Sequence, residues 1–202
     1  MRPSVHRVSV ATSACRALAV GAACAVAMTA GALTGSAAPA QEATPGAILP
    51  AASCTIPPLT LPLFGGTPAT ALLATPAPAE GAALAPVDAA TETAVRTGVA
   101  GILACLNTGD PTQTWAIFTR GYLARTFGNP ETAYLPAFER ALDAAPADPA
   151  PVYVIQSFVI DGQMADGRVV VALTLAAGDE VWADRLVLAE VDGRWLIDAA
   201  LI

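Results

Sequence analysis

The sequence contains no lysine, and its one histidine, His6, stands near the N-terminus. Positive charge comes from ten arginines alone, against seventeen aspartates and glutamates, and the formal net charge is −7. A surface that binds nucleic acid phosphates or anionic lipids needs an excess of cationic side chains. The composition therefore disfavours nucleic acid and anionic membranes as partners.

The residues of several familiar sites are also missing. A zinc site takes several cysteines or histidines, and this chain has few of either. Gly65-Gly66 is not flanked by the strand and helix that a phosphate-binding loop needs. Neither Ser53 nor Ser157 has a base partner that would make it a nucleophile. We therefore expect no metal and no cofactor.

Residues 1–40 have the pattern of an export signal. Arginines precede an alanine-rich apolar run from Ala17 to Ala30, and Ala38-Pro39-Ala40 supplies small residues around a cleavage point. The apolar run is short and weakly hydrophobic for a membrane span. We expect a protein of the cell envelope or the secreted fraction. A retained N-terminal anchor and lipid attachment at Cys24 are the alternatives.

Removal of this signal leaves two cysteines, Cys54 and Cys105. Two cysteines in an exported protein usually form a disulfide. A bridge that closes a loop of this length stabilises a fold by about 4 kcal/mol in the chain-entropy model. Two free buried thiols are the alternative.

Residues 41–87 are rich in alanine, proline and threonine. This composition does not support a helix or a central strand, and it predicts a flexible or extended spacer. The stretch from Ile56 to Phe64 is more apolar than a free linker requires. Either it lies on the folded domain, held by a bridge between Cys54 and Cys105, or it is as disordered as the rest of the spacer.

Three helices are expected after the spacer. The first spans roughly residues 88–107, where apolar residues recur at helical spacing. The second begins at Asp110-Pro111, a capping carboxylate followed by a proline at the first helical position. The third spans about residues 132–144. The second helix carries an aromatic face made of Trp115, Phe118 and Tyr122.

The chain from Val152 to Ile202 consists of four β-rich runs. The turns between the runs pair glycine with aspartate, at Asp166-Gly167, Gly178-Asp179 and Asp192-Gly193. These residues tolerate the positive φ angles of tight hairpins. The pattern predicts an antiparallel four-stranded meander, and with the helices an α+β domain over residues 88–202.

Two stretches of this domain resemble the NTF2-like superfamily, which includes the SnoaL-like cyclases and the ketosteroid isomerases. The first runs from Leu103 to Phe118 and contains a Gly109-Asp110 joint between two helices. The second is the last hairpin, from Trp182 to Ile197, with its Asp-Gly-Arg-Trp ending. The resemblance covers about residues 88–202. It implies three helices packed on a curved sheet, which curls into a cone around a pocket.

Isomerase chemistry is not expected from this resemblance. Ile102 stands where the isomerases have a hydrogen-bonding tyrosine. Arg125 falls near the position of their general-base aspartate, and an arginine cannot abstract a proton. Asp184 alone falls near an isomerase role, that of the protonated aspartate in the oxyanion hole.

The candidate pocket residues are the aromatic and polar side chains that helical or strand periodicity places toward the cone. They are Trp115, Phe118, Tyr122, Phe138, Gln156, Phe158, Trp182, Asp184 and Trp195. Each is also explained by a purely structural role. If Asp184 faces the cone, its burial suits an acid or a hydrogen-bond donor; if it faces outward, it is a solvated carboxylate.

The sequence thus predicts a secreted NTF2-like domain without catalytic activity. It would bind a small apolar ligand in its cone or a partner protein through its sheet. The alternative is an isomerase, dehydratase or cyclase that uses Asp184 with a second carboxyl group or Tyr122. A third possibility is a homodimer formed through the sheet. A further alternative is a cone whose interior is filled by its own side chains, which would make the domain a scaffold.

Overall fold

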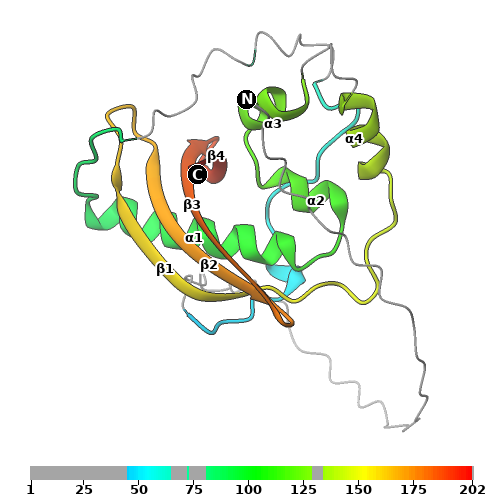
Figure 1. Cartoon of the computed structure of the whole chain (residues 1–202), viewed down its shortest axis with the longest axis horizontal. Helices are drawn as coiled ribbons and strands as arrows, with labels where there is room; N and C mark the ends of the chain where they lie inside the picture. The colour runs from blue at the N-terminus through cyan, green and yellow to red at the C-terminus, as the bar shows by residue number, and fades with distance from the viewer. Residues whose placement is uncertain (1–44, 65–71, 73–80, 129–133, 202) are drawn as a thin grey trace, which may run out of the picture. The chain divides into compact units, whose positions relative to one another are not determined.

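The structure, a computed structural model, describes residues 45–64, 72, 81–128 and 134–201 (Figure 1). The expected export signal and its alternatives, including Cys24, lie outside the described residues. Within the described part, four α-helices precede a four-stranded antiparallel sheet. The predicted α+β class is therefore confirmed.

The sheet is a meander with the strand order β1-β2-β3-β4. Its strands are β1 (Val154–Gln163), β2 (Val169–Ala177), β3 (Glu180–Val191) and β4 (Arg194–Leu201). The last turn shows why aspartate and glycine stand between the strands. Asp192 and Gly193 have φ angles of 51° and 72°, as a tight hairpin with the twist of its strands requires.

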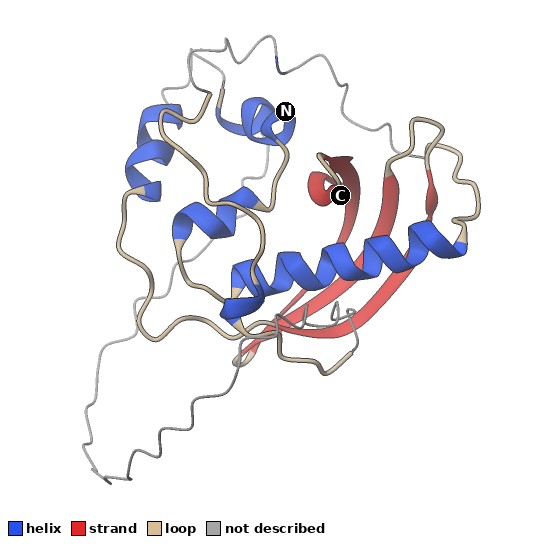
Figure 2. Ribbon diagram, turned by 180° about the vertical axis from the view of Figure 1, so that it is seen from behind, coloured by secondary structure: helices blue, strands red, loops and turns tan. Residues whose placement is uncertain are grey.

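Helix α1 (Ala89–Leu106) crosses one face of the sheet (Figure 2). It begins where expected, because the Asp88 carboxylate accepts hydrogen bonds from the backbone N–H groups of Ala90 and Thr91. The predicted apolar stripe of this helix is buried. At Gly98 the helix comes so close to β4 that a Cβ atom would lie 2.5 Å from the Cβ of Trp195. A glycine is needed there because the helix and the strand pack in contact.

The second expected helix is interrupted. Its residues form α2 (Pro111–Ala116) and α3 (Arg120–Phe127), and the three residues between them leave the helical path. The backbone N–H of Ile197 on β4 donates to the carbonyl of Ile117, and the N–H of Thr119 donates to the carbonyl of Ile197. Thr119 then caps α3 with its side chain. Between α2 and α3 the backbone therefore pairs with the edge of the sheet instead of continuing the helix. As a result, four α-helices are described where three were expected.

Helix α4 (Tyr134–Leu142) lies within the third expected helix, the first two residues of which are outside the described part. Helices α2, α3 and α4 meet through their aromatic side chains. The Trp115 ring centroid lies 5.2 Å from that of Phe118 and 4.9 Å from that of Phe138. Phe118 stacks on Tyr122 at 4.7 Å, and Phe127 on Phe138 at 3.9 Å. We call these five residues the aromatic cluster.

The segment Cys54–Phe64, which we call the strap, is packed on the domain. A disulfide joins Cys54 to Cys105 at the end of α1, as expected. Ile56, Leu63 and Phe64 are buried, and the N–H of Leu63 donates to a carboxylate oxygen of Glu139 at 2.8 Å. This part of the expected spacer is therefore a structural part of the domain, as the apolar character of the strap suggested.

Other described parts of the expected spacer also lie on the domain. Leu49 is 1% exposed, and its carbonyl accepts a hydrogen bond from the buried side chain of Asn107. Ala85 pairs with Gln163 at the edge of β1. No helix in the described part of the chain combines the length and the apolar character needed to cross a membrane.

Candidate binding cleft

A cleft of about 1120 Å³ lies beside the ends of two hairpins. One wall is the strap, with Ile56 and Leu59, and another is the junction of α2 and α3, with Phe118. The β1–β2 turn and the β3–β4 hairpin supply the rest of the lining, including Trp195. Four segments that are far apart in the sequence therefore meet at one cavity. We call this cavity the cleft.

The polar part of the cleft is built around Asp198, which is 3% exposed. One carboxylate oxygen accepts a hydrogen bond from Arg168 at 2.8 Å. The other accepts from the hydroxyl of Thr119 at 2.6 Å and from Arg125 at 3.2 Å. A buried carboxylate is stable only when it is paired and hydrogen-bonded, and here both oxygens are engaged.

A β-bulge places Asp198 in this position. Val187 on β3 pairs with Ala199, and the next residue, Leu188, pairs with Ile197, so Asp198 has no partner opposite it. A bulge re-aims side chains relative to the regular alternation of a strand. Because of the bulge, three consecutive residues of β4, Ile197, Asp198 and Ala199, are buried. In a regular strand with one solvated face, every second residue would be exposed.

Arg168 reaches Asp198 from the β1–β2 turn, two strands away. It also pairs with Asp166, whose carboxylate oxygen lies 2.6 Å from its Nη2. The hydrogen bond from Arg168 lowers the pKa of Asp166 below its usual value, and the same hydrogen bond raises the pKa of Arg168. Arg168 thus ties the turn to β4 over the intervening strand.

Most of the predicted aromatic pocket residues pack against one another or in the core and do not line the cleft. Trp115, Tyr122 and Phe138 belong to the aromatic cluster, and Phe158 packs in the core with the Arg96 guanidinium 5.3 Å from its ring centroid. Burial raises the pKa of Tyr122. Among the predicted aromatic residues, Phe118 and Trp195 are the two that line the cleft. The packing of Trp115, Tyr122, Phe138 and Phe158 is that of a filled interior, one of the alternatives that the sequence analysis left open.

The polar candidates on the sheet are exposed. Gln156 and Asp184 face solvent, and Trp182 is 39% exposed and contacts Tyr153 with its ring centroid 5.9 Å away. None of these three predicted residues lines the cleft. Of the two alternatives for Asp184, the structure shows the solvated carboxylate.

Sequence reasoning did not identify Arg168, Thr119 and Asp198 as a group. Their hydrogen bonds join residues 30 and 79 positions apart, which no local pattern reveals. The one available signal is Asp198 itself, a carboxylate within an otherwise apolar run at the end of the chain. Such a residue needs a partner if the run is buried.

Comparisons with protein-family models, with characterised proteins and with solved structures found no match to this chain. Among the described residues, no group of three or more histidine, cysteine, aspartate or glutamate side chains is placed to hold a metal ion. The proposed function therefore rests on the cleft and the residues around it.

Proposed function

We propose that this chain is an exported, NTF2-like domain without catalytic activity that binds a small, largely apolar ligand in the cleft. The observation that carries the proposal is the cleft itself. Its volume of about 1120 Å³ is slightly above the range of about 300–1,000 Å³ that is typical of ligand sites, and its walls combine apolar side chains with polar groups. The order of the elements, helices and then a four-stranded meander, supports the NTF2-like part.

The state of the carboxylates favours binding over catalysis. A general acid or base must be free to exchange a proton with a substrate. The buried carboxylate of the cleft, Asp198, is held on both oxygens by protein donors. Asp184, on which the isomerase-type alternative depends, is exposed, and neither it nor Tyr122 lines the cleft.

A neutral fluorescent probe tests ligand binding at the cleft. We expect N-phenyl-1-naphthylamine to bind saturably with a blue-shifted emission. Ala189 on β3 lines the cleft, so Ala189→Phe should fill part of it and raise the dissociation constant about tenfold or more. The measurement is a fluorescence titration of each purified protein.

Ala183→Phe is the matched control, because Ala183 lies on the same strand, is exposed and does not line the cleft. It should leave the dissociation constant within about twofold of the original value. The absence of saturable binding, or an equal effect of the two variants, would remove the cleft as the ligand site.

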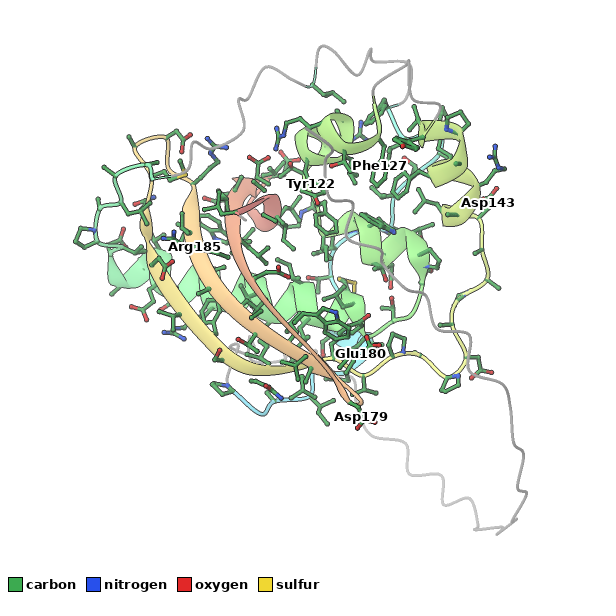
Figure 3. The ribbon with its side chains drawn as sticks, in the orientation of Figure 1. Tyr122, Phe127, Asp143, Asp179, Glu180 and Arg185 are labelled. Carbon is green, nitrogen blue, oxygen red and sulfur yellow. A yellow bond between two sulfur atoms is a disulfide. The ribbon has the colours of Figure 1, made fainter. Side chains whose placement is uncertain are left out.

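A second candidate function is binding of a protein partner, including a second copy of the chain, through the sheet face opposite α1. This face is toward the viewer in Figure 1. Register places Val159, Val181 and Arg185 on it, and the two valines are 55% and 56% exposed. Among the described residues, one ion pair lies on this face and joins Arg185 (labelled in Figure 3) to Asp161 at 2.6 Å. Exposed apolar residues on a sheet face with little net charge favour association.

Solution scattering tests the self-association form of this second candidate. A dimer gives twice the mass of the chain, and Val181→Glu should return it to the monomer mass, because two carboxylates would be buried at the interface. Glu substitution at Val152, which is 51% exposed and precedes β1, is the control and should leave the mass unchanged. A monomer mass for the unaltered protein would remove the homodimer.

A further inference from the structure

The cleft contains an arginine whose guanidinium has no partner in the described structure. Arg194, at the start of β4, is partly buried and lines the cleft. Its Nε is buried and has no hydrogen-bond partner, and it is the one such side-chain atom among the described residues. No ion pair joins Arg194 to any of them either. Buried donors are nearly always satisfied, so an unsatisfied one at a cavity calls for an acceptor.

The other arginines with buried or half-buried side chains are already engaged. Arg168 and Arg125 bind Asp198, and Arg96 pairs with Glu92 at 2.8 Å. Two acids on the same hairpin, Glu190 and Asp192, also line the cleft. Both are exposed to solvent, and neither forms an ion pair with Arg194. Arg120 also lines the cleft, but it is exposed to solvent, so Arg194 is the partly buried arginine of the lining that is not engaged by an acid among the described residues.

We propose that the ligand of the cleft is an amphipathic organic anion, with Arg194 binding its anionic head group. This inference rests on the proposed ligand-binding function. A guanidinium presents parallel N–H donors that match the oxygens of a carboxylate or sulfonate. The apolar side chains of Leu59, Phe118 and Trp195 line the same cavity and would contact the apolar body. An apolar site with one well-placed charged group binds such a ligand in one orientation.

The negative net charge of the chain makes a preference for anionic ligands informative. At −7 the protein repels anions at long range, so unspecific attraction works against an anionic ligand. A preference for an anion over its neutral counterpart would therefore report a local cationic group in the cleft.

Two probes with the same ring system distinguish the contribution of the anionic head group to affinity from that of the apolar body. They are 1-anilinonaphthalene-8-sulfonate, which is anionic, and N-phenyl-1-naphthylamine, which lacks the sulfonate. We expect the folded full-length protein to bind the anionic probe about tenfold or more tightly, as one charge-assisted hydrogen bond provides. Arg194→Gln should abolish that preference, so that the ratio of the two dissociation constants falls to about one.

Arg185→Gln is the matched control, because Arg185 is an exposed arginine of the same sheet that does not line the cleft. It removes the same charge and should keep the preference for the anion. If both probes bind equally to the unaltered protein, or if Arg185→Gln and Arg194→Gln act alike, Arg194 is not the head-group site although the cleft still binds ligands. If neither probe binds, the proposed function fails and this inference fails with it.

Discussion

Asp198→Asn is expected to lower the free energy of unfolding by about 3 kcal/mol, because it removes the negative charge that compensates a buried arginine. Arg168 is 7% exposed, and Asp198 is one of the two carboxylates that pair with it among the described residues. Asp166 remains as the second partner, which places the effect at the lower end of the range for breaking a buried pair. Urea denaturation at neutral pH, with the slope of each transition compared, measures the change.

Asp161→Asn provides the matched control. Asp161 also contacts an arginine at 2.6 Å, but the pair is on the surface, with side chains 26% and 49% exposed. Solvent screens such a pair, and its loss should cost at most about 1 kcal/mol. Equal losses for the two asparagine variants would contradict the assignment of Asp198 as the centre of the buried network.

Removal of the disulfide is expected to have a similar effect. The double variant Cys54→Ala, Cys105→Ala releases a constraint on a loop with a sequence separation of 51 residues. In the chain-entropy model this lowers the free energy of unfolding by about 4 kcal/mol. Alanine suits both positions, because Cys105 is fully buried among apolar residues and Cys54 is partly buried. Denaturation under oxidising conditions measures the loss.

A reducing agent supplies the control for this second prediction. It should destabilise the bridged protein by a similar amount and leave the double variant unchanged. Cys15 and Cys24, which lie outside the described residues, are replaced by alanine in every protein compared so that one bridge alone can form. Stability that does not respond to reduction would mean that the bridge contributes nothing.

The Asp198 network and the disulfide also hold the walls of the cleft together. The disulfide anchors the strap, from which Ile56 and Leu59 enter the lining. The Asp198 network joins the β1–β2 turn, the start of α3 and β4. Walls that are held in place before a ligand arrives lower the entropy cost of binding it. The same interactions that stabilise the fold therefore support the proposed ligand site.

Local chemistry in the sequence determined much of the architecture. The caps at Asp88 and Asp110 start α1 and α2 where they were expected, and aspartate beside glycine marks all three hairpin turns. The pairing of Cys54 with Cys105 followed from their number. Each of these features depends on residues within a few positions of one another, or on a count, so the printed sequence is sufficient to predict it.

The tertiary structure alone decided where the second helix breaks, where the bulge falls and where the cavity lies. Ile117 and Thr119 leave a helical pattern because the edge of β4 offers backbone partners from nearly eighty residues away. Asp198 meets Arg168 through a bulge in the pairing of β3 with β4, and Arg168 comes from the β1–β2 turn. Most of the aromatic residues that looked like a pocket pack against one another or in the core, while Phe118 and Trp195 line a cleft that forms between segments distant in the chain. Periodicity specifies the face on which a side chain lies, but not which other segment packs against that face, because that choice is made by long-range packing.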